Sequence, residues 1–394
     1  MALIPGDNVI LLPAKGGVRI AVPVRSANIP GNTGLLLNDS GGKRIVIKLA
    51  PVAPTDKIIS APDSGGKKIA VKCGGIMPNP PEPTGWTDVF SPGAAGYSTK
   101  CFETWNGYIY HGANHPVFFG FIYRYSIAGG WEQVLNSTYY TAYTIYSLKV
   151  FGTYIYAGHD SGGIINGGIA RSADGSFGSF AQVFDSGSAG SYVQAFETMG
   201  AAIYGMYYDA IAAKYKILSS VNGTVWNTLY TSATVNDAFW GLTTDGTNLY
   251  TIYMDLSAWP PASSDIYSSA DGATWAAESW GFGAGVYPLG IKYLNGHLYA
   301  GLSSGEVWRD GVSVCTDPAG NAFYDFCECE ELLFAACGGT NARVYYSEDN
   351  GLTWTLIYEP VGAYTIMEAT GSLGKRVYVG SSLNWDVFQS AEIK

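Results

Sequence analysis

The chain has 394 residues, of which 47% are hydrophobic and only 14% are charged, and it contains 51 glycines and 29 tyrosines. No apolar run approaches the roughly 20 residues that a membrane-spanning helix needs, so we expect no membrane insertion. Long helical patterns are missing, and β-branched and aromatic residues outweigh the strong helix formers. This balance favours an all-β protein of many short strands and tight turns.

Charge is distributed unevenly along the chain. Residues 1–80 hold ten Lys and Arg against four Asp and Glu, a balance of +6, whereas residues 81–394 hold twelve against twenty-eight, a balance of −16. The difference predicts two modules. The acidic module offers few cations to phosphate groups, so we expect neither nucleic acid nor an anionic membrane as its partner.

Residues 1–75 contain three copies of one short pattern, at residues 9–22, 35–48 and 57–72. Each copy has an apolar strand, a Gly-Gly pair that begins at Gly16, Gly41 or Gly65, and a return strand of alternating basic and aliphatic residues. The pattern predicts three β-hairpins. A single hairpin is marginally stable, so we expect these to pair with one another, with other subunits or with a larger assembly. Their basic faces could suit nucleic acid, but aromatic residues for base stacking are absent, and a solvated strand face explains the lysines.

Residues 76–85 contain four prolines and predict a stiff, extended linker. Beyond it, seven copies of a strand that ends in an aromatic residue lie at residues 108–110, 154–156, 202–204, 248–250, 297–299, 332–334 and 376–378. Their spacing of 35 to 49 residues fits four short strands per unit and predicts a seven-bladed β-propeller over residues 86–394. The seventh unit ends after its third strand. Residues 86–90 resemble the outer strands at 131–135 and 354–358, so we expect them to complete the last blade and close the ring.

One turn recurs between the strands, at residues 172–177, 220–226, 269–275 and 347–354, with a worn copy at 126–131. In the 347–354 copy, Asp349 can accept hydrogen bonds from its own turn, Gly351 can take a positive φ, and Trp354 begins a strand with a ring to bury. The residues at the position of Asp349 in the other copies are Asp174, Asn222 and Asp271. The pattern resembles the Asp-box (BNR) repeat of sialidase-like β-propellers. This resemblance covers about residues 85–394 and implies a fold but no reaction, because such repeats occur in families with unrelated activities.

In a propeller of this kind, ligands usually bind at the face that carries the loops between blades and the loops between second and third strands. Candidate residues there combine aromatic rings with carboxylates, which suits sugars, whose C–H faces stack and whose hydroxyls need acceptors. They are Phe119, His159, Asp160, Tyr208, Asp209, Asp255, Trp259, Trp385 and Asp386. Ordinary loop packing explains any one of them at least as well.

An enzyme is the alternative hypothesis. Sialidases hold the substrate carboxylate with three arginines and carry an Arg-Ile-Pro motif, but no such motif precedes the first blade here, and the five arginines of the propeller lie beside strand cores. Xyloglucanase-like propellers use two aspartates across a cleft. Here Asp160, Asp209, Asp255 and Asp386 could supply them. We expect no cofactor and no metal, because Cys327, Cys329 and Cys337 lack a matching ligand pair and fit buried thiols better.

These observations predict a structural and recognition protein that is not an enzyme. Residues 1–75 are expected to anchor it in a larger assembly, as a homo-oligomer or on a particle, while the propeller meets a cell-surface glycan or a protein. The hairpin repeats resemble a module of a bacteriophage tail fibre or virion appendage. The first residues do not resemble a secretory signal, so we expect a virion or an extracellular assembly. A secreted or particle-borne glycoside hydrolase of the sialidase or xyloglucanase-like type is the other reading.

Overall fold

A computed structural model describes two parts of the chain to different depths. Side chains are described for residues 85–91, 98–114, 120–135, 144–160, 166–360, 366–382 and 386–393, and between residues 8 and 72 the backbone of six strands is described. The chain divides into two compact units, residues 1–80 and 81–394. Within the described residues, no helix is long and apolar enough to cross a membrane.

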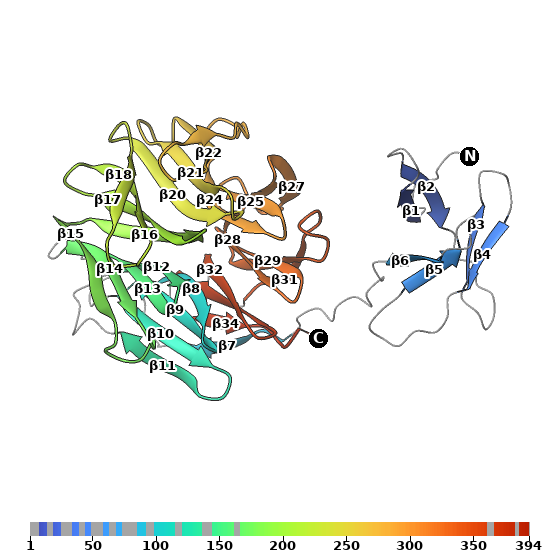
Figure 1. Cartoon of the computed structure of the whole chain (residues 1–394), viewed down its shortest axis with the longest axis horizontal. Coiled ribbons are helices and arrows are strands. Elements are labelled where there is room, and N and C mark those ends of the chain that lie inside the picture. Colours follow the sequence, from blue (N-terminus) through green and yellow to red (C-terminus); the bar gives the residue numbers. More distant parts are fainter. Residues whose placement is uncertain are drawn as a thin grey trace. The chain divides into compact units, whose positions relative to one another are not determined.

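The first unit contains three two-stranded antiparallel sheets (Figure 1). The pairs are β1 (Asn8–Pro13) with β2 (Arg19–Val24), β3 (Gly34–Asn38) with β4 (Arg44–Lys48), and β5 (Ile58–Pro62) with β6 (Lys68–Lys72). In each pair the first residue of one strand faces the last residue of the other. The predicted turns at Gly16, Gly41 and Gly65 lie outside the described residues.

The second unit is a seven-bladed β-propeller, in which seven four-stranded antiparallel sheets form a ring (Figure 1). The first, innermost strands are β8 (Ser98–Trp105), β12 (Ile145–Phe151), β16 (Tyr192–Met199), β20 (Asp237–Thr244), β24 (Pro288–Leu294), β28 (Ala322–Cys329) and β32 (Met367–Leu373). The second strands are β9 (Tyr108–Asn114), β13 (Tyr154–His159), β17 (Ala202–Asp209), β21 (Leu249–Asp255), β25 (His297–Leu302), β29 (Leu332–Gly338) and β33 (Arg376–Ser381).

Two further strands complete each blade. The third strands are β10 (Phe121–Ser126), β14 (Asn166–Ser172), β18 (Lys214–Ser220), β22 (Ser263–Ser269), β26 (Glu306–Arg309), β30 (Arg343–Ser347) and β34 (Val387–Gln389). The outer strands are β11 (Gly130–Leu135), β15 (Ala181–Ala189), β19 (Asn227–Thr231), β23 (Ala276–Ala277), β27 (Val312–Thr316), β31 (Thr355–Tyr358) and β7 (Thr87–Phe90). Neighbouring inner strands contact one another around the ring, and β32 contacts β8. The all-β, seven-bladed fold predicted from the repeats is confirmed.

The outer strand of the seventh blade comes from the start of the unit. β7 pairs with β34 in antiparallel register, with Phe90 opposite Val387 and Thr87 opposite Gln389. Just before β7, the ring of Trp86 stacks on the ring of Tyr358 in the sixth blade, with centroids 4.9 Å apart. One sheet therefore joins the first and last segments of the propeller by backbone hydrogen bonds.

The recurring aromatic residues of the second strands form a stripe between the blades. The stripe consists of Tyr110, Tyr156, Tyr204, Tyr250, Tyr299, Phe334 and Tyr378. Tyr110, Tyr299 and Tyr378 are fully buried. Because side chains alternate along a strand, one large ring per blade fills the space against the next sheet.

The four complete copies of the recurring turn, at residues 172–177, 220–226, 269–275 and 347–354, are here called the repeat turns. They connect the third strand to the outer strand with a shared pattern of hydrogen bonds. In residues 347–354, Ser347 Oγ accepts a hydrogen bond from Gly351 N at 2.8 Å. Asp349 Oδ1 accepts one from Thr353 N at 2.8 Å, and Trp354 Nε1 donates to the Gly351 carbonyl at 3.1 Å. The equivalent acceptors in other blades are Asp174 for Ser176 N, Asn222 for Val225 N and Asp271 for Thr274 N.

Each repeat turn also rests on the stripe aromatic of the preceding blade. Gly351 has a φ of +74°, and a Cβ at this position would collide with the ring of Tyr299. Tyr299 Oη donates to the Asn350 carbonyl at 2.6 Å. The same close approach joins Gly175 to Tyr110, Gly223 to Tyr156 and Gly272 to Tyr204. The repeat turns thus hold neighbouring blades together.

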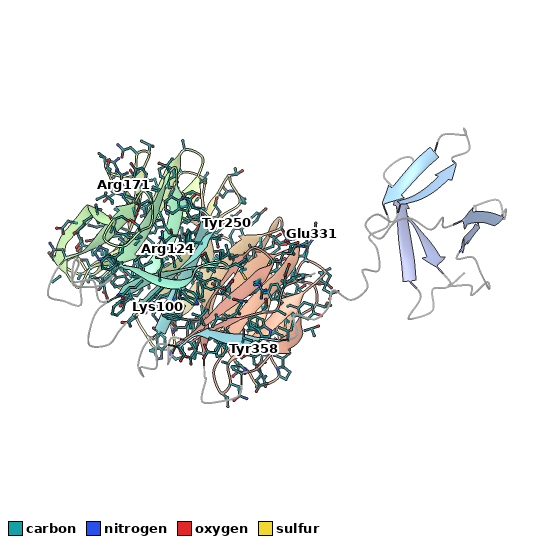
Figure 2. All side chains as sticks on the ribbon, turned by 90° about the horizontal axis from the view of Figure 1, so that it is seen from below. Lys100, Arg124, Arg171, Tyr250, Glu331 and Tyr358 are labelled. Carbon is teal, nitrogen blue, oxygen red and sulfur yellow. The ribbon has the colours of Figure 1, made fainter. Side chains whose placement is uncertain are left out.

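Two arginines strengthen this junction between blades. Arg124 and Arg171, both labelled in Figure 2, lie on third strands of neighbouring blades. Their Nη1 atoms donate to the carbonyls of Asp174 and Asn222, each in the repeat turn of the following blade. Charged donors on turn carbonyls make stronger bonds than neutral ones.

Replacing Gly351 with Ala is expected to destabilise the protein more than the matched change Gly107→Ala. Both glycines have a positive φ, which costs an L-residue about 1 kcal/mol, but nothing lies within 4 Å of a Cβ at Gly107. Urea unfolding of the two variants measures the difference in the free energy of unfolding. Equal losses would show that the contact between Gly351 and Tyr299 contributes nothing.

Trp86→Ala is expected to lower the free energy of unfolding by about 2–3 kcal/mol, because it removes a packed ring at the ring-closing strand. Trp259→Ala is the control, since that side chain is 74% exposed, and a change within about 0.5 kcal/mol is expected. Thermal and urea unfolding compare the two. If both variants were as stable as the wild type, the Trp86 contact would not secure the closure.

Candidate binding site

The inner strands share a register shift at nearly the same height. A β-bulge occurs between Thr99 and Cys101 in β8, and equivalent shifts occur in the other six inner strands. In each blade, one inner-strand residue pairs with the stripe aromatic of the second strand. The residue three positions before this partner lies at the height of the bulge, and in the seven blades it is Lys100, Tyr146, Gln194, Trp240, Leu289, Tyr324 and Glu368. We call these seven residues the bulge ring. All of them line one cavity of about 400 Å³. A β-bulge changes the direction in which a side chain points, and here one side chain per blade lines the central cavity at the height of the bulge.

The cavity continues past the bulge ring to a second layer of charged residues. Glu103, Lys149, Glu197 and Lys292 lie opposite the stripe aromatics of their blades, and they line the cavity together with Asp325. In all, three lysines and four carboxylates line this space. The wall is therefore close to charge balance, although the propeller as a whole is acidic.

Two ion pairs connect neighbouring blades inside the cavity. Lys100, which is labelled in Figure 2, has its Nζ 2.7 Å from Glu368 Oε2 and so joins the first blade to the last. Lys149 Nζ lies 2.6 Å from Glu197 Oε1 and joins the second blade to the third. These four groups are partly or largely shielded from solvent, so salt screens them less than surface pairs.

The remaining charged groups of the cavity have shifted pKa values. Burial raises the pKa of Glu103, and the attraction of Lys149 and Lys292 offsets only part of this effect. Burial also raises the pKa of Asp325, against the opposing influence of Lys292 and of the hydrogen bonds from Thr370. Burial alone would lower the pKa of Lys292, but the surrounding carboxylates outweigh it and raise that pKa. Lys292 is thus held as a cation that faces the cavity.

Aromatic residues surround the mouth of the cavity. Trp240 is 46% exposed and is the one exposed large apolar side chain on the described inner strands. The rings of Tyr146 and Tyr192 lie 5.0 Å apart, and Tyr192 stacks on Tyr208 at 5.1 Å. Tyr324, on the inner strand of the sixth blade, is the third aromatic residue of the bulge ring.

The mouth opens on the face opposite the repeat turns. The bulge ring lies near the N-terminal ends of the inner strands, whereas each repeat turn follows the C-terminal end of a third strand. First and third strands run in the same direction in an antiparallel sheet, so these two ends lie on opposite faces. This is the face on which the sequence analysis placed ligand sites.

Two of the residues predicted from the sequence lie at this mouth. Tyr208 packs on Tyr192, as described above. Asp160 accepts a hydrogen bond from Thr144 N at 2.7 Å and another from Tyr146 Oη at 3.3 Å, so its carboxylate positions a ring of the mouth.

Other predicted residues have structural surroundings. Asp209 forms an ion pair with Lys216 at 2.7 Å and accepts two backbone hydrogen bonds of its own turn. Asp255 caps a turn through Ser257 N at 2.9 Å. His159 and Asp386 are buried, with 5% and 2% of their surfaces exposed, and burial lowers the pKa of His159 and so favours its neutral form. Trp259 is exposed on a loop, and Phe119 and Trp385 lie outside the described residues.

Four aromatic residues of the cavity were not predicted from the sequence, because they lie on or beside inner strands and not in the loops: Tyr146, Tyr192, Trp240 and Tyr324. The sequence does contain a regular spacing for these residues. In every blade, the bulge-ring residue stands three positions before the inner-strand residue that pairs with the stripe aromatic. Identifying that partner residue requires the strand register, which spacing alone does not supply.

The polar lining of the cavity combines lysine donors with carboxylate acceptors. In the described part of the chain, no group of three or more His, Cys, Asp and Glu side chains could hold a metal ion. Cys327, Cys329 and Cys337 are buried, and burial raises the pKa of each thiol. Alternating lysines and carboxylates can instead donate to and accept from the same polar ligand.

Glu103→Gln is expected to gain stability relative to the wild type as pH rises from 4 to 7. The folded-state pKa of Glu103 is raised, so the folded protein binds more protons than the unfolded chain from about pH 4.3 upward, and wild-type stability falls over that window. Glu197→Gln is the contrast, because it breaks a shielded ion pair and should destabilise at pH 7. Urea unfolding across this pH range checks both. Equal destabilisation by the two changes would contradict the burial argument.

No protein-family model matches the chain, and no curated protein matches it in sequence. Solved β-propellers share its fold. YCF48 bound to a D1 peptide has a TM-score of 0.57 and 12% identity, over 78% of this chain and 96% of that one. The WD40 repeats of RRP9 have a TM-score of 0.54 and 11% identity, over 78% and 97%. Puromycin hydrolase has a TM-score of 0.53 and 11% identity, over 74% of this chain and 51% of that one. These likenesses establish the propeller fold.

Proposed function

We propose that the propeller is a recognition module that binds a glycan at the mouth of its central cavity. The observation that carries this proposal is Trp240, a large ring with nearly half of its surface exposed on an inner strand that lines the cavity. Tyr146, Tyr192 and Tyr324 line the same cavity. Aromatic rings of this kind stack on the C–H faces of sugars, and the cavity volume of about 400 Å³ lies within the usual range of ligand sites.

The charge of the wall favours a neutral sugar. Lys100, Gln194 and Lys292 can donate to hydroxyl oxygens, and Glu103 and Asp325 can accept from hydroxyl groups when ionised. No arginine is among the described residues that line the cavity. An acidic sugar would need such a cation for bidentate recognition of its carboxylate, so neutral glycans fit this site better.

The four aspartates considered as catalytic residues support binding better than hydrolysis. Asp209 and Asp255 cap turns, Asp386 is buried, and Asp160 holds Tyr146. None of the four is among the described residues that line the cavity.

The rest of the chain suits a module that displays the propeller. We propose that the repeat turns are Asp-box turns, which is supported by their shared Ser, Asp and Gly hydrogen bonds. We also propose that residues 1–75 attach the propeller to a larger assembly, such as a bacteriophage particle, which is supported by the three regular strand pairs and their positive charge.

The glycan proposal is tested by array and calorimetric binding of neutral and acidic glycans to the wild type and to Trp240→Ala. We expect binding to neutral glycans that weakens at least tenfold in the variant, which corresponds to about 1.4 kcal/mol. Phe177→Ala is the matched control, because that ring is 53% exposed but belongs to a repeat turn on the opposite face. Unchanged binding in Trp240→Ala, or no binding to any glycan, would contradict the proposal.

A further inference from the structure

The loop between β21 and β22 carries Trp259, which has the largest exposed fraction of the exposed large aromatic side chains in the described part of the chain. Trp259 is 74% exposed. Its loop is nevertheless fixed by hydrogen bonds, because Ala262 N donates to the Asp255 carbonyl at 2.8 Å and Leu256 N donates to the Asn236 carbonyl at 2.8 Å. The ring is thus held in water by an ordered backbone, with most of its apolar surface open to a ligand.

Trp259 is connected to the mouth of the cavity by a second aromatic residue. Its ring lies 5.4 Å from the ring of Tyr287, at an angle of 56°. Tyr287 directly precedes the inner strand β24, and its backbone N donates to Ser303 Oγ at 3.1 Å. Tyr287 lies two residues before Leu289 of the bulge ring, and β24 packs against β28, which carries Tyr324. A Cβ at Gly290 of β24 would collide with the backbone carbonyl of Tyr324, so the two strands approach closely at this height.

The three residues therefore follow one another from the outer loop to the cavity: Trp259 on the loop, Tyr287 against its ring, and Tyr324 on the inner strand that packs against β24. The loop of Trp259 joins a second to a third strand, and Tyr287 precedes an inner strand. Both positions belong to the face on which the bulge ring opens. Trp259, Tyr287 and Tyr324 are hereafter the aromatic row.

We propose that the aromatic row is an outer subsite, which binds the sugar units that follow the unit held at Trp240, so that the ligand is an oligosaccharide chain. This inference rests on the proposed function and adds the length of the ligand to it. A single sugar ring covers one aromatic face, and the exposed ring of Trp259 lies beyond the cavity, so a monosaccharide in the mouth leaves it uncovered. A chain that continues along Tyr287 covers it. The carboxylate of Asp255, at the base of the loop, is partly exposed and can accept hydroxyl protons beside this subsite.

The test is a length series of neutral oligosaccharides, from one to six units of β-1,4-linked glucose, β-1,3-linked glucose and β-1,4-linked N-acetylglucosamine. We expect the affinity of the wild type for at least one series to rise with length and then to level off. Trp259→Ala should weaken binding of the long members about fivefold to tenfold and leave the monosaccharide and disaccharide unchanged. Trp240→Ala should weaken every length.

Three results separate the possibilities. Binding that depends on Trp240 but not on length, or equal binding of long chains by the wild type and Trp259→Ala, would overturn the outer subsite and leave the proposed function intact. Failure of every probe to bind would contradict the proposed function and the inference together. Trp259→Phe, which keeps an aromatic face, should retain most of the affinity for long chains, and a loss equal to that of Trp259→Ala would also count against the subsite. Because Trp259 is exposed, Trp259→Ala is expected to fold normally, so weaker binding by this variant would not reflect unfolding. Urea unfolding of Trp259→Ala checks this expectation.

Discussion

The propeller depends on one close approach that is repeated between blades: the glycine of a repeat turn lies against the stripe aromatic of the blade before it. Gly351 on Tyr299 and Gly272 on Tyr204 show the geometry, in which a Cβ would collide with the ring. The turn needs a positive φ and the ring needs a flat neighbour, so glycine satisfies both demands at once. The polar residues of the turn then keep the backbone in that shape, because Asp349 Oδ1 accepts a hydrogen bond from Thr353 N in the same turn.

This arrangement leaves the inner strands free for another role. The blades are joined through the stripe and the repeat turns, and the ring is closed by β7 on β34. At the axis, the inner strands bulge at one height and line a cavity with charged and aromatic groups. Lys100 with Glu368 and Lys149 with Glu197 link blades there as well, yet Trp240 remains exposed and Lys292 faces the cavity as a cation. The scaffold and the candidate site thus use different strands and opposite faces.

The fold could be predicted from the sequence because its determinants are local. A stripe aromatic recurs once per blade, and each repeat turn carries its own Ser, Asp or Asn, and Gly, so spacing alone counts the blades. Trp86 also resembles Trp354 closely enough to suggest the strand that completes the seventh sheet. The candidate site could be predicted only in part. Asp160 and Tyr208 were predicted as loop residues, although Tyr208 lies in β17. Trp240 and Tyr324, by contrast, lie on inner strands whose register is set by the bulges, and the sequence does not reveal those bulges.

The central claim is that a neutral oligosaccharide covers Trp240 at the mouth of the cavity. Hydroxyl-radical footprinting of the full chain, with and without a saturating oligosaccharide, tests it most directly. We expect protection of Trp240, Tyr192 and Tyr324, with Phe177 on the opposite face unchanged. Protection at Phe177 with none at Trp240 would contradict it.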